Sequence, residues 1–255
     1  MNLAAFTKEP KRIMSKLHRY DYLLSVLPTL EQMGSIPPLS KHDFLEQVIG
    51  SNGPVSTVEM LLLSDDLMQY QALLAEEIEQ DRTDLAILSL DKAENESVLP
   101  DFLLPEETTE KQESMRLSVD EIWTRYFHHA ASVAKRTRSS FLKAWIGYEV
   151  GLRNALVTAR ALILELDSAA YLVAPELADK DTDYSHIVSE WSGASDPLTA
   201  LKVLDEARWD WLEENGGWYS FYACEIEVYA ARLVLLHRWR RILSEKHQRN
   251  ETSLT

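Results

Sequence analysis

Apolar side chains recur every three or four positions along most of the chain, which is the spacing of one face of an α-helix. Residues 57–80 show this spacing in Leu67, Tyr70, Leu74 and Ile78. The polar triplet SDD in the middle of the stretch leaves two structures open. The stretch forms one continuous helix, or two helices that separate at the triplet.

A second helical pattern runs from residue 118 to about residue 167. Ser118 and Glu121 match a capping box, in which the serine caps the helix and the glutamate returns a hydrogen bond. The polar residues 135–140 separate two apolar stripes, so we expect two helices or one kinked helix. This stretch and the last helix each carry a wide stripe that neither can bury alone, so the two are expected to pack together. The stripes are Trp123, Phe127, Ala130, Ala131 and Ala134, then Phe141, Trp145, Tyr148, Leu152 and Leu156.

Shorter signals place the remaining helices. Ser40 is a candidate N-cap for a short helix that ends at Gly50. Asp196-Pro197 is a typical helix start, because proline suits the first helical position, and this helix stops before the Gly-Gly pair at 216–217. The final helix covers about residues 219–248.

Residues 20–30, YDYLLSVLPTL, are apolar and partly β-branched or aromatic. They are compatible with a short strand, a buried extended segment or a helix, and the pattern does not decide among these. Because the chain has only 8 Gly and 9 Pro in 255 residues, helices are favoured over a turn-rich β fold. We therefore predict an all-α, elongated helical bundle with at most a short N-terminal strand.

Three parts are expected within one compact unit: an N-terminal helical part (1–80), an acidic connector (81–117) and a long-helix bundle (118–250). Between Glu59 and Glu121 the chain has 4 basic and 18 acidic residues, a balance of 4 − 18 = −14, out of a net charge of −15. Such an acidic molecule is repelled by nucleic acid, so no nucleic-acid partner is expected.

Basic residues gather near both ends, in residues 8–19 and 232–249. The second group includes Arg238, Arg240 and Arg241, which are candidates for contact with an acidic protein surface. Trp209 and Trp211 are two positions apart and cannot face the same way on one helix. They are either interface anchors or core-edge residues of a large helical protein.

The targeting and redox features indicate a cytoplasmic protein. Cys224 is the only cysteine, which excludes an intramolecular disulfide and fits a reducing compartment. We find neither a signal peptide nor an apolar run of about 18 residues, the length that a membrane span needs. No direct membrane insertion is expected, so any membrane association would be peripheral and would come through a complex.

The chain carries no recognisable catalytic or ligand-binding motif. GxxxxGK[ST], GxGxxG, HExxH and the Glu-x-x-His pairs of di-iron bundles are all missing from the sequence. His128 and His129 lie on different faces of a helix and do not form a metal site. We expect no catalytic residue, cofactor or metal. If the chain is an enzyme after all, Glu149, Arg153 and Glu225 are the first residues to inspect.

Glu149 and Arg153 lie four residues apart on a helix rich in aliphatic and aromatic groups, a spacing that permits an intrahelical ion pair. The pair is either solvated, or partly buried and able to fix helix register or contact a partner; Asn154 could then supply a further hydrogen bond. Because Glu149 lies at the margin of the apolar stripe, we expect both side chains to be at least half buried. We also expect them to contact a polar group of the final helix.

Several segments together resemble an uncharacterised bacterial protein family encoded beside subunits of V-type (A/V-type) ATPases. They are YDYLLSVLP, PPLSKHDFLE, FLKAWIGYEVGLRNALVTARA, RWDWLEEN and EVYAARLVLLHRWRRIL, which together span most of the chain. The WxxYExxLRN block is more distantly similar to the funnel subunit of those ATPases, a helical protein that sits on the membrane ring and receives the central stalk. This chain is shorter than the funnel subunit and lacks three matching helical repeats.

The resemblance implies a non-catalytic accessory or central-stalk component that contacts V-type ATPase subunits of the stalk or membrane ring. A coupling role of this kind needs rigid helices and partner surfaces rather than chemistry. The alternative is a helical adaptor of an unrelated complex, and an enzyme of unknown class is the third possibility.

Overall fold

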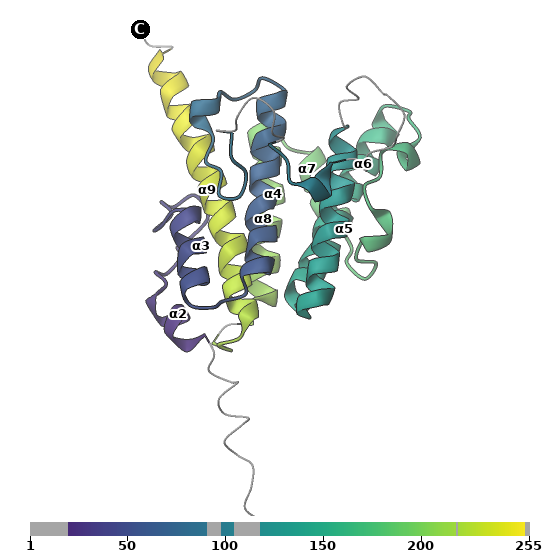
Figure 1. The fold of residues 1–255 in the computed structure, drawn as a ribbon. Coiled ribbons are helices and arrows are strands. Elements are labelled where there is room, and N and C mark those ends of the chain that lie inside the picture. The colour runs from purple at the N-terminus through teal and green to yellow at the C-terminus, as the bar shows by residue number, and fades with distance from the viewer. Residues whose placement is uncertain (1–19, 91–97, 105–117, 218, 253–255) are drawn as a thin grey trace, which may run out of the picture.

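The computed structural model describes residues 20–90, 98–104, 118–217 and 219–252, and within these ranges the chain is helical, with no strand. The all-α prediction is therefore confirmed (Figure 1). The α-helices are α2 (Asp21–Val26), α3 (Lys41–Gly50), α4 (Val55–Leu74), α5 (Val119–Thr137), α6 (Ser140–Ile163), α7 (Ser185–Ser192), α8 (Pro197–Asn215) and α9 (Ala223–Thr252). Short 3₁₀ turns are η1 (Gln80–Arg82), η2 (Asp101–Leu103), η3 (Ser168–Tyr171) and η4 (Pro175–Leu177).

The N-terminal segment forms a helix rather than a strand. α2 buries Leu23 against the core and ends before Pro28, whose carbonyl accepts a hydrogen bond from the Tyr229 hydroxyl of α9 (2.9 Å). A short helix suffices here because the apolar side chains of YDYLL need only one contact face.

α4 is continuous through the triplet Ser64-Asp65-Asp66, so the alternative of two helices is excluded. Both aspartates are fully buried and bind partners on other elements. Because they point away from the local backbone, they do not compete with the helical hydrogen bonds that such residues often disrupt.

The long helical pattern divides into two helices at Arg138. This residue adopts the left-handed conformation (φ 59°, ψ 32°) that commonly ends a helix, and Ser139 then caps α6 by accepting the N–H of Leu142 (2.9 Å). The capping box of Ser118 and Glu121 at the start of α5 is confirmed.

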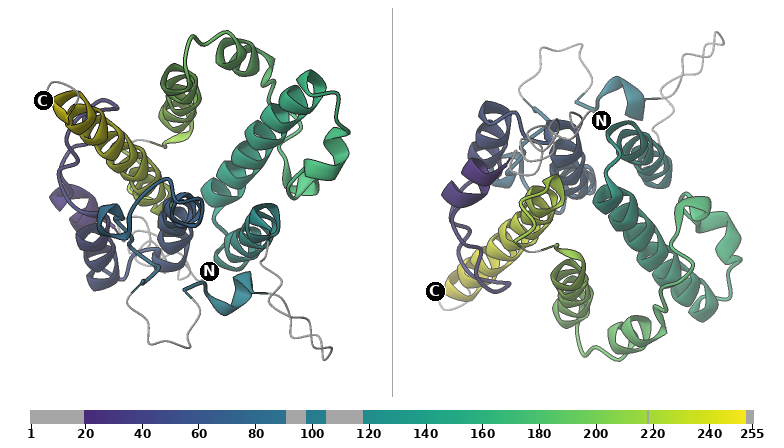
Figure 2. Two further views of the ribbon diagram at one scale, coloured as in Figure 1. Left: turned by 90° about the horizontal axis from the view of Figure 1, so that it is seen from above. Right: turned by 90° about the horizontal axis from the view of Figure 1, so that it is seen from below.

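Six helices form a ring in which each contacts the next, in the order α4, α5, α6, α7, α8 and α9, and α9 closes the ring on α4 (Figure 2). The pairing expected between residues 119–167 and the last helix is correct for α6, which contacts α9. However, the main neighbour of α9 is α4, and α5 packs on α4 and α6 instead. The reason is that α4 buries residues on opposite sides, such as Leu62 and Leu67, and so occupies the space between α5 and α9.

A segment that follows α6 crosses this helix at two glycines one turn apart. The Asp179 N–H binds the Gly147 carbonyl (2.9 Å), and a Cβ at Gly151 would lie 2.7 Å from two ring carbons of Tyr184. The sequence GYEVG in α6 therefore forms a shallow channel that receives residues 177–184.

Part of the stretch expected as an acidic connector reaches the core. Leu88, Leu99 and Leu103 are at most 7% exposed, and the Leu104 carbonyl accepts a hydrogen bond from Arg125 (2.9 Å). Among the described residues, no helix has both the length and the apolar character required to cross a bilayer.

Candidate functional site

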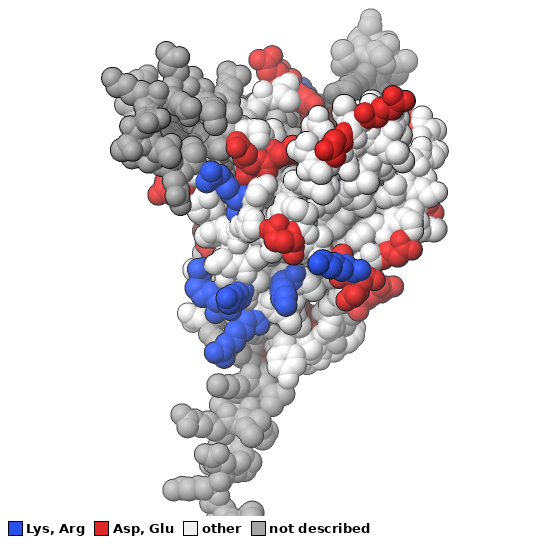
Figure 3. Space-filling model, turned by 90° about the vertical axis from the view of Figure 1, so that its right-hand side faces the viewer, with Lys and Arg blue, Asp and Glu red and all other residues white. Residues whose placement is uncertain are grey.

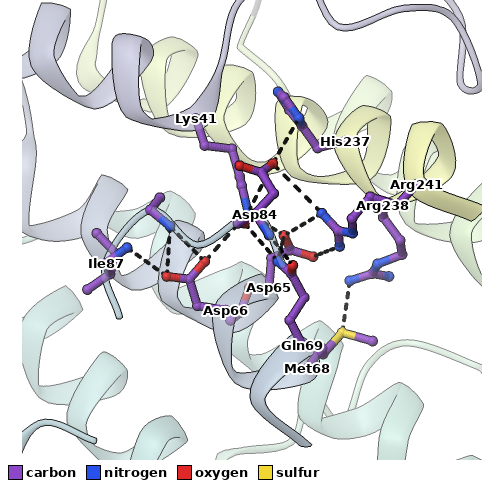
Figure 4. Close-up of polar contacts among 12 residues, drawn as sticks. Lys41, Asp65, Asp66, Met68, Gln69, Asp84, Ile87, His237, Arg238 and Arg241 are labelled. Atoms are coloured by element: carbon purple, nitrogen blue, oxygen red, sulfur yellow. Dashed lines mark hydrogen bonds and ion pairs between the residues drawn. The ribbon is translucent and has the colours of Figure 1, made fainter. Parts of the chain in front are cut away.

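The densest polar cluster lies between α3, α4, α9 and the segment after η1 (Figure 4). Lys41, the first residue of α3, is fully buried. Its Nζ lies 2.6 Å from Asp65 Oδ2, 3.5 Å from Asp66 Oδ1 and 3.8 Å from Asp84 Oδ2, and it also donates to the Asp84 carbonyl. One lysine thus connects three carboxylates from two segments.

α9 and α4 complete the coordination of Asp65. Arg241 binds it with both guanidinium nitrogens, Nη2 to Oδ1 at 2.8 Å and Nη1 to Oδ2 at 3.2 Å. Gln69 donates to Asp65 (3.0 Å) and exchanges hydrogen bonds with the backbone of Asp84 (2.8 and 2.9 Å). His237 bridges Asp84 Oδ2 (3.2 Å) and the carbonyl of Leu39 (2.9 Å).

Asp66 holds the chain that returns from η1. Its carboxylate accepts the backbone N–H groups of Ala86, Ile87 and Leu88, at 2.6 to 3.1 Å. Three successive donors on one carboxylate fix this segment on α4 and satisfy backbone groups that would otherwise be buried without partners.

The electrostatics of the cluster favour a charged Asp65. Burial alone would raise the pKa of its carboxyl, but Lys41, Arg241 and Arg238 outweigh burial and hold the pKa below its ordinary value. For Asp66 burial prevails over Lys41 and the three N–H donors, and the pKa is raised. The hydrogen bond from His237 lowers the pKa of Asp84.

A second buried network adjoins the first and joins α6, α8 and α9. Asp205 is fully buried and accepts from Arg208 (3.0 Å), Arg238 (2.9 Å) and the Trp239 indole N–H (3.0 Å). Arg208 also binds both oxygens of Glu149, at 2.7 and 3.1 Å. Although burial of Arg208 opposes its charge, these two carboxylates raise its pKa above the ordinary value.

The expected pair of Glu149 and Arg153 does not form as a direct contact. Glu149 binds Arg208 of α8, and Arg153 binds Asp120 of α5 (3.3 Å) and lies over the Trp123 ring (5.1 Å). Their side chains are 20% and 29% exposed, which confirms the predicted burial and the contact with other segments. The expectation that the final helix supplies the partner was wrong, because α5 and α8 flank this edge of α6.

The other residues singled out from the sequence have separate places. Asn154 does not join Glu149 and Arg153; it is buried and pairs with the N–H and carbonyl of Val173 (3.0 and 2.9 Å). Trp209 lies beneath Arg232 (4.6 Å), whereas Trp211 packs with Phe141, Trp145 and Tyr148 of α6.

The three arginines of the final helix differ in their surroundings. Arg238 and Arg241 belong to the two networks, and Arg240 is exposed. The N-terminal basic stretch, residues 8–19, lies outside the described residues. In the final helix, side chains are described only up to residue 245.

The two networks hold helices in place and do not open onto a substrate site. Lys41, Asp65, Asp66 and Asp205 are fully buried, and the described residues include no group of His, Cys, Asp and Glu side chains that could hold a metal ion. Sequence reasoning did not identify Lys41 or Asp65 as partners. The available signal was the acidic pair inside the apolar run LLLSDDL, which marks carboxylates that need buried cations.

Comparison with known proteins identifies one family. The model of DUF2764, described as a protein of unknown function, matches residues 67–251. The match begins within α4 and includes α5 to α9, with all of the second charge network and the Gln69, Asp84 and α9 members of the first. No curated protein and no solved structure matches this chain.

Proposed function

This chain belongs to the DUF2764 family, and we propose that it is a non-catalytic accessory or central-stalk component of a V-type ATPase, acting through protein–protein contacts. The sequence blocks that resemble proteins encoded beside V-type ATPase subunits supply the identity of the complex. The observation that carries the mechanical role is the pair of adjoining buried charge networks, which tie α3, α4, α6, α8 and α9 together.

Such networks suit a part that transmits force. A buried ion pair adds little net stability, but it disfavours displacement of its helices, because separating the charges leaves each one buried and unpaired. The ring of helices therefore resists sliding at the contacts of α8 and α9 with the rest. A coupling element needs this resistance because it must pass on a displacement without absorbing it.

An exposed apolar surface at the end of α6 supports a role in protein contact. Leu162, Ile163 and Leu164 are 79%, 72% and 64% exposed, and Leu166 and Tyr171 follow at 48% and 45%. Clustered exposed side chains of this size are typical of protein interaction sites.

The same apolar surface also fits a helical adaptor of an unrelated complex, which is the second candidate. An enzyme is less well supported, because the three residues named for it have separate structural roles. Glu149 is bound by Arg208, Arg153 by Asp120, and Glu225 accepts the N–H groups of residues 219 and 221 near the start of α9.

The test is affinity purification of the tagged chain from the cell that normally makes it, followed by mass spectrometry. We expect V-type ATPase subunits among the recovered proteins, at levels above those from a tagged unrelated protein. Recovery of a different, reproducible set of proteins without any ATPase subunit would contradict the proposal and favour the adaptor.

A further inference from the structure

One stretch of this acidic chain has no acidic residue at all. Between Glu121 and Glu149 the sequence contains five Lys or Arg residues and no Asp or Glu. Four of the five, Lys135, Arg136, Arg138 and Lys143, are exposed and lie where α5 ends and α6 begins. Figure 3 faces this side of the molecule and shows Lys and Arg gathered at one end of it.

These cations differ from the other basic residues in having no counter-charge. Within the described residues no ion pair is formed by Lys135, Arg136, Arg138 or Lys143. In contrast, Lys202 pairs with Glu206, and the buried arginines have carboxylate partners. The α5–α6 corner therefore keeps an unbalanced positive field at a surface otherwise dominated by acidic groups.

The corner forms one wall of an open groove with a volume of about 1270 Å³. Lys135, Arg138 and Lys143 line it, together with Lys180 from the segment that crosses α6. Because that segment is anchored by the hydrogen bond from Asp179 to Gly147, the width of the groove is set by backbone contact. Apolar lining comes from Ala131, Ala144, Leu177 and Trp211.

We propose that this groove binds an acidic segment of another protein. The four lysine and arginine side chains would face its carboxylates, and the apolar lining would receive side chains between them. The inference goes beyond the proposed function, because it requires only an acidic partner segment, whichever complex supplies that segment.

Two other occupants fit less well. Nucleic acid would bring phosphates against Glu176, Asp179 and Glu214, which also line the groove, and would approach a molecule of net charge −15. A second copy would have to present its own acidic surface to the basic corner. Such a head-to-tail contact does not close on itself and joins two strongly acidic molecules.

The experiment titrates the full chain into a fluorescein-labelled peptide rich in Glu and Ala and follows fluorescence anisotropy at low and moderate salt. Two charge-matched double variants are compared: K135E/K143E in the groove, and R82E/K202E away from it. Both change the net charge equally and alter exposed side chains. We expect K135E/K143E to weaken binding about tenfold or more, and R82E/K202E less than about twofold.

Circular dichroism melts establish that both variants fold, and K135Q/K143Q, which only removes charge, should give an intermediate loss. Equal losses in the two reversal variants, or no saturable binding by the unmodified chain, would overturn the proposal. Tighter binding of a single-stranded oligonucleotide of equal charge would overturn it in favour of nucleic acid. Self-association in sedimentation that K135E/K143E abolishes would overturn it in favour of a second copy. None of these results depends on the ATPase, so the purification experiment and this titration fail independently.

Discussion

Glu149 of α6 and Arg208 of α8, 59 residues apart in the chain, form a two-point ion pair with distances of 2.7 and 3.1 Å. Arg208 continues to Asp205, and Asp205 to Arg238 of α9. Alternating charges therefore run through the interior from one side of the helix ring to the other, and each charge depends on its neighbours in this series.

Replacing Glu149 with Ala should destabilise the protein by about 1–3 kcal/mol, because Arg208 then remains largely buried with one carboxylate fewer. Urea unfolding of E149A, R208A and the double variant measures the coupling energy. We expect a favourable coupling of about 1 kcal/mol or more for this pair.

The matched comparison is E149A with R153A, since Arg153 lies four residues from Glu149 but binds Asp120. Its coupling to Glu149 should be within about 0.5 kcal/mol of zero. A larger coupling of Glu149 to Arg153 than to Arg208 would show that the helix-internal pair, and not the link to α8, is the relevant interaction.

Lys41 is the cation on which the first network depends. K41M should cost about 3–5 kcal/mol of unfolding free energy, because Asp65 and Asp66 would lose a shared partner while staying buried. K202M, which removes an exposed lysine paired with Glu206 at i,i+4, should cost about 0.5 kcal/mol or less. Chemical denaturation of both variants decides the matter, and similar losses would show that the network contributes no more than a surface pair.

Glu227 of α9 is a buried carboxyl that has no ion pair within the described residues and accepts a hydrogen bond from Ser139 (2.9 Å). Burial raises its pKa above the ordinary 4.5 despite the hydroxyls of Thr57 and Ser139. For a raised carboxyl pKa, the stabilising contribution is complete below the unfolded value and is lost as pH rises through the folded value.

E227Q removes this titration while keeping a hydrogen-bond acceptor. We expect the midpoint of thermal unfolding of E227Q to exceed that of the unmodified protein at about pH 8, by about 2–4 °C for each kcal/mol of relief. The difference should shrink toward about pH 5, where the native carboxyl gains its proton. A difference that does not depend on pH would argue that Glu227 is not a source of pH-dependent strain.

Gly151 is required by the close approach of Tyr184, whose ring carbons lie 2.7 Å from the position of an added Cβ. G151A should therefore destabilise by about 1–3 kcal/mol through overpacking. G50A, where an added Cβ meets nothing within 4 Å, should leave stability unchanged or slightly raised. Thermal melts compare them, and a neutral G151A would mean that residues 177–184 can withdraw from α6 without loss.

The local features of this fold were predictable from sequence because local signals encode them. The capping box at Ser118, the proline start of α8 and the break between α5 and α6 depend on residues within one or two turns. The partners of buried charges depend on the tertiary arrangement instead. Glu149 has an eligible arginine four residues away, yet it binds one on a different helix.

The candidate site was harder to predict for the same reason. Asp65 and Asp66 look like helix breakers when only their neighbours are considered, and the burial of Asp65 in α4 depends on Lys41 and Arg241, 24 and 176 residues away. The unbalanced basic corner was visible as a run without acidic residues, but its relation to a groove required the position of residues 176–182.

The most direct test of the central claim is reciprocal purification through a tag on a catalytic V-type ATPase subunit, with quantitative mass spectrometry of the intact complex from native cells. The account predicts that this chain is recovered in a fixed ratio to the stalk subunits across independent preparations. Recovery of the complete ATPase with this chain absent, or present only at the level found in untagged controls, would contradict it.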